Sequence, residues 1–151
     1  MASIETTKNI VKPAIKFLEV LRPLLDIGIR LYVANVFFFS GLLKTDSWWK
    51  TLSQFERDFH VPLLSPEVAA YLGTGAELIL PVFLVLGLGG RAAAIGLFIF
   101  NAVAIISFPE LAGTGLTLHH LWGLLLLVTL IHGPGKLSID HFIRKKYMGD
   151  V

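Results

Sequence analysis

The sequence predicts an all-α integral membrane protein, a four-helix bundle with an N-terminal interfacial helix and a short C-terminal surface helix. The first supporting observation is composition, since the 151-residue chain is 54% hydrophobic and its mean hydropathy is +0.71. The second is the distribution of charge, because acidic and basic residues are missing from residues 31–43, 78–90, 92–109 and 111–135. Helices of a soluble bundle carry charge on their outer faces, whereas these blocks are apolar all round.

The apolar blocks define four membrane-spanning helices and, with their flanks, three parts of the chain. We expect the spans at about 24–44, 67–87, 91–109 and 117–134. Each is close to the roughly 20 residues that cross a hydrocarbon core of about 30 Å. The runs do not alternate and are rich in Leu, Ala and Gly, which argues against a β-barrel. The parts are an amphipathic segment at 1–22, the bundle at 23–135 and a basic cytoplasmic tail at 136–151.

The N-terminal segment carries apolar residues at helical spacing, from Ile10 to Leu21. This spacing predicts a helix over 3–22 that lies on the membrane surface, and a frayed tail is the alternative. The segment has neither the short apolar core nor the small-residue cleavage site of a secretory signal peptide.

The first loop, at 45–66, is polar and aromatic. Ser47 or Asp46 can cap a short helix over 47–59, which we expect to rest at the outer interface. One face of that helix carries Trp48, Leu52, Phe55 and Phe59. Ser65 and Pro66 then form a start signal for the second span.

Glycines mark the remaining connections. GLGGR at 87–91 predicts a tight turn between the second and third spans, and HGPGK at 132–136 predicts the end of the fourth. Neither has the spacing of a nucleotide-binding loop. Ser138 can cap a short surface helix over 138–147.

The basic residues predict the orientation in the membrane. Nine of the thirteen lie on one side of the predicted spans, namely Lys8, Lys12, Lys16, Arg22, Arg91, Lys136, Arg144, Lys145 and Lys146. The positive-inside rule then places both termini in the cytoplasm and the loops at 45–66 and 110–116 outside. The basic tails suit an anionic inner leaflet and do not require a nucleic acid.

Glu77 is the acid inside the second span. At 1.5 Å per residue it lies about 15 Å above the inner boundary, level with Asn101, and Arg30 lies about 9 Å above it. A lone charge at this depth costs about 2.5–3.5 kcal/mol or more. We therefore expect Glu77 to face the bundle interior and to contact Asn101, Arg30 or both. Pro81 also leaves the carbonyl of Glu77 without its helical donor. A ligand site and a structural clasp between helices both remain open.

The fourth span carries His119 and Trp122 on one face. His120 points about 100° away on a helix with 3.6 residues per turn, so the adjacent histidines are poorly placed to share a metal. We expect no metal site. The candidate ligand-binding residues are Arg30, Glu77, Asn101, His119 and Trp122, with Lys44 and His120 as secondary candidates. The alternatives are that the histidines are interfacial, that Asn101 only joins helices and that Lys44 snorkels to the surface.

Three segments resemble the DoxX family of small bacterial four-helix membrane proteins. They are Arg30, Gly41 and Lys44 with their spacing, residues 75–97, and residues 119–140, and the similarity extends over about 22–145. The resemblance implies an inner-membrane protein associated with oxidoreductase systems, including thiosulfate:quinone oxidoreductase subunits and an oxidative-stress complex.

The first hypothesis is therefore a membrane subunit or accessory of a quinone-linked oxidoreductase. The chain has no cysteine, so any redox role requires a quinone, a bound cofactor or a partner subunit rather than thiol chemistry. The second hypothesis is a module that binds or transports a small molecule, a lipid or a metal. The third is a scaffold for a partner protein. Catalytic residues, and whether the chain forms a homo-oligomer, are left open.

Overall fold

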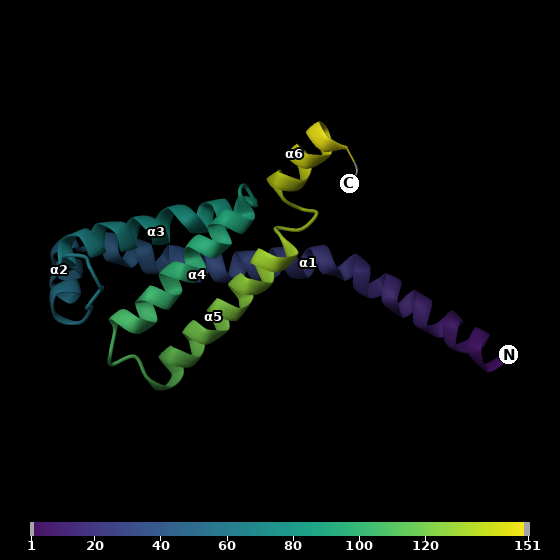
Figure 1. The fold of residues 1–151 in the computed structure, drawn as a ribbon, viewed down its shortest axis with the longest axis horizontal. Coiled ribbons are helices and arrows are strands. Elements are labelled where there is room, and N and C mark those ends of the chain that lie inside the picture. The colour runs from purple at the N-terminus through teal and green to yellow at the C-terminus, as the bar shows by residue number, and fades with distance from the viewer. Residues whose placement is uncertain (1, 150–151) are drawn as a thin grey trace.

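The computed structural model describes the backbone of residues 2–149 and the side chains of residues 11–149. This part of the chain forms six helices and no strands (Figure 1). The helices are α1 (Ala2–Asp46), α2 (Trp48–Arg57), α3 (Pro66–Leu86), α4 (Gly90–Ser107), α5 (Gly113–His132) and α6 (Ile139–Met148).

Four of these helices are long and apolar enough to cross a membrane, and they confirm the predicted helical bundle. The apolar stretches are Val11–Asp46, Pro66–Leu86, Gly90–Ser107 and Gly113–His132. The observed ends of α3, α4 and α5 differ from the predicted ends by only a few residues, because Gly, Pro and Ser give clear start and stop signals for helices there. The chain is a multi-pass membrane protein.

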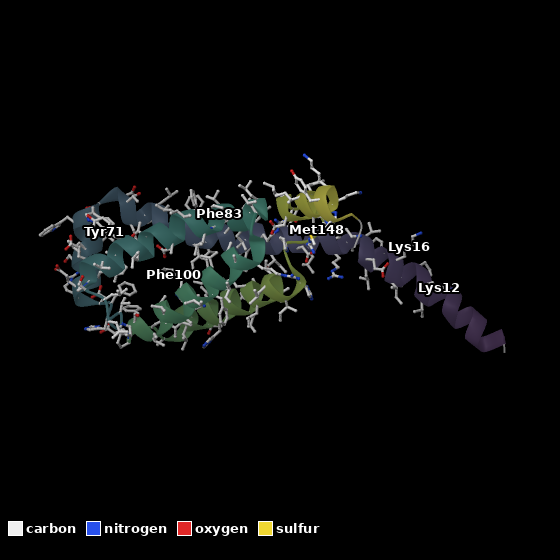
Figure 2. All side chains as sticks on the ribbon, turned by 45° about the horizontal axis from the view of Figure 1, so that its top comes forward. Lys12, Lys16, Tyr71, Phe83, Phe100 and Met148 are labelled. Atoms are coloured by element: carbon white, nitrogen blue, oxygen red, sulfur yellow. The ribbon has the colours of Figure 1, made fainter. Side chains whose placement is uncertain are left out.

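Helix α1 differs from the prediction in being continuous. We expected separate helices over 3–22 and 24–44, but one helix runs through both Pro13 and Pro23. A proline removes one hydrogen bond and bends a helix, and the turns on either side can still propagate. The N-terminal part of α1 projects beyond the other helices, and Lys12 and Lys16 lie on this projection (Figure 2). Its position on the membrane surface stays a prediction.

Helix α2 covers one end of the bundle, which we call the α2 end. As predicted, the face of α2 that carries Trp48, Leu52 and Phe55 is apolar, but α2 ends at Arg57, so Phe59 follows the helix instead of lying on it. Phe55 is buried against Ala69 and Ala70 of α3, with Trp48, Leu52, Phe59 and Val61 packed around them. The Thr51 hydroxyl donates a hydrogen bond to the Lys44 carbonyl at 2.8 Å, so it satisfies one of the last carbonyls of α1.

The opposite end, which we call the turn end, is closed by the 87–89 turn and by α6. Gly87 has a φ of +62°, and a Cβ there would lie 2.5 Å from the Ser138 Cβ, so the turn requires glycine for both conformation and space. The Asp140 carboxylate accepts hydrogen bonds from the backbone amides of Gly89 at 2.8 Å and Gly90 at 2.9 Å. It therefore caps the start of α4 and ties α6 to the bundle. Ser138 caps α6, as the sequence predicts.

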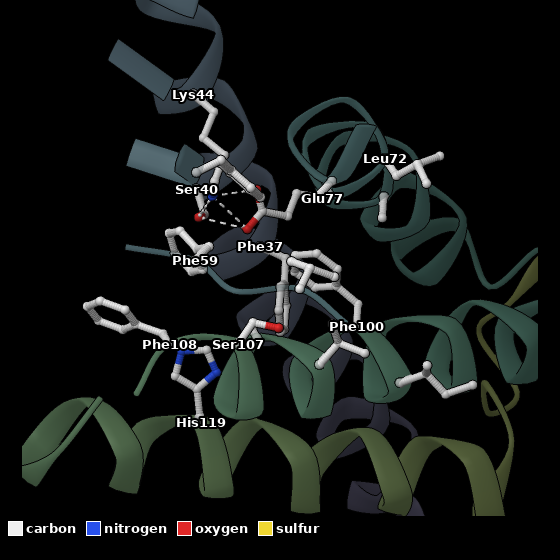
Figure 3. A pocket seen from close by; sticks show the side chains of 18 of the residues that line it. Phe37, Ser40, Lys44, Phe59, Leu72, Glu77, Phe100, Ser107, Phe108 and His119 are labelled. Carbon is white, nitrogen blue, oxygen red and sulfur yellow. Dashed lines mark hydrogen bonds and ion pairs between the residues drawn. The ribbon is translucent and has the colours of Figure 1, made fainter. Parts of the chain in front are cut away.

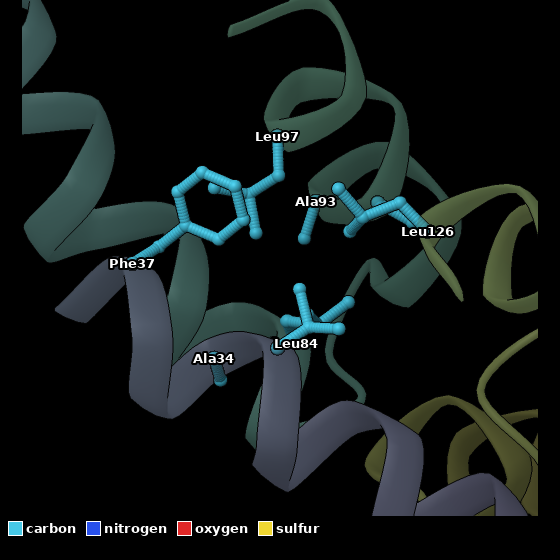
Figure 4. Packing of buried hydrophobic residues seen from close by; sticks show 8 residues of the cluster. Ala34, Phe37, Leu84, Ala93, Leu97 and Leu126 are labelled. Atoms are coloured by element: carbon cyan, nitrogen blue, oxygen red, sulfur yellow. The ribbon is translucent and has the colours of Figure 1, made fainter. Parts of the chain in front are cut away.

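The four long helices form a ring in which α3 packs on α1 and α4, and α5 packs on α4 and α1. Their interior is a small aliphatic and aromatic core (Figure 4) made of Val33, Ala34, Phe37, Leu84, Ala93, Ala94, Leu97 and Leu126. Tyr71 and Phe83 of α3 are among the large apolar side chains that stay exposed, as lipid contact requires. From the turn end, α3 and α4 diverge toward the α2 end (Figure 1).

Candidate functional site

Arg30 lies at the turn end, where it binds backbone carbonyls. The side chain is 2% exposed. Its Nη1 donates to the Val85 carbonyl at 3.1 Å and to the Leu84 carbonyl at 3.5 Å, and its Nη2 donates to the Leu137 carbonyl at 2.7 Å. The guanidinium thus satisfies carbonyls at the end of α3 and joins them to the segment before α6.

The predicted contact between Arg30 and Glu77 is wrong, and the register of α1 against α3 explains why. Gly41 lies beside Glu77, since a Cβ on Gly41 would be 3.0 Å from the Glu77 Cβ. Arg30 is eleven positions before Gly41, or about 16 Å along the helix axis. The sequence places Arg30 well inside the membrane because the first span is expected to begin near residue 24, whereas Arg30 lies level with Val85, near the end of α3.

The partner of Glu77 is Lys44, which comes from the last turn of α1. Lys44 Nζ lies 2.7 Å from Glu77 Oε2, 2.9 Å from Glu77 Oε1 and 2.9 Å from Ser40 Oγ. The Ser40 hydroxyl donates to Glu77 Oε1 at 2.9 Å, which completes the network (Figure 3). Helical side chains tilt toward the N-terminus, so Lys44 reaches back one turn to Ser40. Lys44 therefore points into the bundle rather than snorkelling outward.

This ion pair borders a cavity of about 510 Å³ near the α2 end. The cavity lies where α3 and α4 diverge, and aromatic side chains from α1, α2, α4, α5 and the loops supply part of its lining: Phe37, Phe55, Phe59, Phe100, Phe108 and Trp122. Its polar lining residues are Ser40, Lys44, Glu77, Ser107 and His119. An apolar interior with a few polar groups is typical of small-molecule sites.

Asn101 and His119 form a second polar pair, so the predicted contact between Asn101 and Glu77 is also wrong. Asn101 Nδ2 donates to the His119 carbonyl at 2.9 Å, and Asn101 Oδ1 lies 2.8 Å from His119 Nδ1. The nearby Gly123 permits this approach of α4 to α5, because a Cβ there would lie 3.3 Å from Asn101 Nδ2. Asn101 of α4 thus binds α5, while Glu77 of α3 binds α1.

Trp122 packs against the His119 ring, and His120 does not contribute to the cavity. The rings of His119 and Trp122 pack edge to face with their centroids 4.8 Å apart. Trp122 packs against Phe37 in the same way, with a centroid distance of 5.9 Å. His120 is exposed and is not among the cavity-lining residues. The structure therefore brings Lys44, Glu77, His119 and Trp122 to one cavity, keeps Asn101 behind His119 and places Arg30 at the other end.

Sequence reasoning missed Ser40, Ser107 and the aromatic lining. Ser40 lies one helical turn before Lys44, so the sequence spacing alone places both residues on the same face of the helix. Ser107 is the polar residue that ends α4, and it is 1% exposed. The aromatic residues come from separate elements, and their convergence depends on the tertiary fold.

Between residues 11 and 149, no group of three or more His, Asp or Glu side chains is arranged to hold a metal ion. The cavity instead combines a large aromatic surface with a carboxylate, an ammonium and an imidazole. Such a lining can hold an organic molecule by ring packing and orient it by hydrogen bonds at its polar groups.

The DoxX family model matches residues 25–110, which include α3, α4 and the bundled part of α1. An uncharacterized protein of Haemophilus influenzae is 32% identical to the chain over 125 residues, which are 79% of this chain and 83% of that relative. No solved structure matches the chain.

Proposed function

The chain belongs to the DoxX family, and on that premise we propose that it binds a quinone, in oxidised or reduced form, in the cavity at the α2 end. In this role it serves as a membrane subunit or accessory of a quinone-linked oxidoreductase system. Six aromatic side chains, among a larger number of aliphatic ones, line the cavity and favour a ring-bearing ligand.

The observation that carries the proposal is the cavity itself. Its volume of about 510 Å³ lies within the range of small-molecule sites, about 300–1,000 Å³, and fits a quinone ring with the first part of its tail. Leu72 and Ile99 border it, and both are exposed on the outer surface of the bundle. A ligand tail can therefore leave the cavity between α3 and α4 and remain in the lipid.

The polar groups support a ligand that carries oxygen atoms on its ring. Glu77 and Lys44 lie on the α1 and α3 side of the cavity, and His119 lies on the α5 side (Figure 3). A ring placed between them has polar groups on either side and aromatic side chains around it. Aromatic residues offer such a ring stacked or edge-to-face contacts, worth about 0.5–1.5 kcal/mol each beyond area burial.

We further propose that the protein lies in the bacterial inner membrane with both termini in the cytoplasm. Lys12, Lys16 and Arg22 lie on the projecting part of α1, and Arg144 to Lys146 lie on α6 at the same end of the bundle. An excess of basic residues at one end is typical of the cytoplasmic side. The cavity then lies in the half of the membrane that faces outward.

The binding proposal is tested by extracting the purified protein with organic solvent and measuring the quinone content by mass spectrometry. We expect quinone to copurify with the unaltered chain and to be lost from Ala104→Phe, which fills the cavity. The matched control is Ala102→Phe on the same helix, because Ala102 is exposed and lies outside the cavity lining. Equal quinone content in both variants would contradict binding in this cavity.

The link to an oxidoreductase system is tested separately. The tagged chain is purified from membranes in a mild detergent, and quinone reductase activity is measured in the eluate. We expect activity to elute with the chain and to remain in the flow-through when the tag is absent. Elution of the chain with quinone but without activity would contradict the subunit role and leave the binding proposal in place.

A further inference from the structure

We propose that the cavity selects ligands that carry hydroxyl donor groups, the hydroquinones and phenols, over ligands that carry only carbonyl groups at the same ring positions. This inference rests on the proposed function and names the redox form of the ligand that the site prefers. It follows from the hydrogen-bonding state of the two polar groups that face each other across the cavity.

The first of these groups is His119, whose tautomer is fixed by Asn101. A backbone carbonyl can only accept, so the Asn101 atom 2.9 Å from the His119 carbonyl is the amide nitrogen. The other atom of the amide, 2.8 Å from His119 Nδ1, is therefore the oxygen, which also only accepts. His119 Nδ1 must then carry the proton. In the neutral imidazole, Nε2 is left as an acceptor.

The acceptor nitrogen is available to a ligand. His119 lines the cavity, and Figure 3 shows its ring standing on α5 with its far edge toward Phe108 and the interior of the cavity. No described residue forms a hydrogen bond with Nε2. The ring also lies beside Trp122, which holds it edge to face at 4.8 Å. The nitrogen is thus a positioned acceptor without a partner in the described part of the chain.

The second group is the Glu77 carboxylate, which also offers acceptor capacity. Each carboxylate oxygen has two lone-pair directions. Oε1 receives Lys44 Nζ and the Ser40 hydroxyl, while Oε2 receives Lys44 Nζ alone. Oε2 can therefore accept one further donor.

Lys44 does not offset this acceptor character. An ammonium has three protons, and three oxygens lie within 2.9 Å of Lys44 Nζ: both Glu77 oxygens and Ser40 Oγ. Two further groups of the lining, Ser107 Oγ and Trp122 Nε1, are buried below the accessible surface and have no partner among the described residues. The groups that a ligand can reach therefore accept hydrogen bonds, and a ligand must supply the donors.

The tautomer is tested without any ligand, by nitrogen-15 NMR of the protein with labelled histidine. His119 signals are assigned by their loss in His119→Phe. We expect the protonated nitrogen of His119 to be Nδ1 in the unaltered protein, and a mixture of tautomers in Asn101→Leu. The control His120→Phe should leave the His119 signals in place. A proton on Nε2 in the unaltered protein would overturn the inference.

The selectivity is tested with three probes of one shape: a short-chain benzohydroquinone, the matching benzoquinone and the hydroquinone dimethyl ether. Binding is measured without oxygen by calorimetry in detergent. We expect the hydroquinone to bind about tenfold more tightly than the other two, as one or two net hydrogen bonds allow. His119→Phe should reduce this ratio, and His120→Phe should preserve it.

The outcomes separate the two proposals. Equal affinity for the hydroquinone and the benzoquinone would overturn the hydroxyl preference and leave quinone binding intact. Failure of all three probes to bind would overturn both the preference and the proposed function. An unchanged ratio in His119→Phe would show that His119 does not confer the preference, and this would overturn the inference as stated.

Discussion

Arg30 and Lys44 lie at opposite ends of the bundled part of α1, and they satisfy their charges in different ways. Arg30 donates to three backbone carbonyls at the turn end, and the charge of Asp26 also attracts it. Lys44 binds a carboxylate and a hydroxyl beside a cavity at the α2 end. The guanidinium of Arg30 is held by backbone carbonyls between closely packed segments. The ammonium of Lys44 belongs to a network of side chains that borders the cavity.

The difference separates a structural end from a binding end. At the turn end, Gly87 leaves no room for a Cβ and Asp140 satisfies the first amides of α4, so the polar groups serve the connections between helices. At the α2 end, α3 and α4 diverge, and aromatic side chains line part of a cavity of about 510 Å³. Substitutions at the turn end should therefore affect stability, and those at the α2 end should also affect binding.

The largest expected effect is that of Arg30→Leu. The variant leaves carbonyls of α3 and of the segment before α6 without a donor in a buried place, so the free energy of unfolding should fall by about 4 kcal/mol. Unfolding by SDS in mixed micelles measures this. The matched control Arg22→Leu, at an exposed position of the same helix, should change it by less than about 0.5 kcal/mol. Equal stability of the two variants would remove the structural role given to Arg30.

Lys44→Met should have the next largest effect, because it leaves Glu77 charged and without its cation. We expect a loss of about 3 kcal/mol. The double variant Lys44→Met/Glu77→Met removes both charges and should regain more than half of that loss. The same unfolding assay on the single and double variants measures the coupling. The cycle also needs the single variant Glu77→Met, and a double variant whose loss equals the sum of the losses of Lys44→Met and Glu77→Met would contradict a direct ion pair.

Asp140→Asn should have the smallest effect of the three. An amide oxygen can accept from one of the two amides of Gly89 and Gly90, but the amide NH₂ cannot accept from the other, so we expect a loss of about 1–2 kcal/mol. Quinone content should stay at the level of the unaltered protein, because Asp140 lies at the turn end. The control Glu110→Gln changes an exposed acid at the other end. A loss of quinone in Asp140→Asn at unchanged stability would contradict the separation of the two ends.

The membrane bundle and most helix ends could be predicted from the sequence because they depend on local signals. Charge-free blocks define the spans, and Ser65 and Ser138 cap α3 and α6 as predicted. The break near residue 23 was wrong because α1 continues through Pro13 and Pro23. A proline lowers the tendency to form a helix but does not fix where a helix ends.

The partners of the buried polar residues could not be predicted because they depend on the register between helices. Hydropathy shows that Glu77 is inside the membrane but not that Gly41 lies beside it, and that contact selects Lys44 over Arg30. The acceptors of Arg30 are backbone carbonyls, and because every residue has one, the residue type does not reveal them. Asn101 binds the backbone and ring of His119 for the same reason: one face of α4 meets α5 there, and hydropathy does not reveal that face.

The length of α1 sets how far the chain extends from the other helices. From Ala2 to Arg30 the helix extends about 42 Å at 1.5 Å per residue, several times the depth of the headgroup layer. The first turn of α1 therefore lies far from the bundle, at the end of one continuous helix. A partner protein bound to this first turn would be held at a fixed distance from the bundle, and every residue deleted between the two would shorten that distance by about 1.5 Å and rotate the first turn by about 100°.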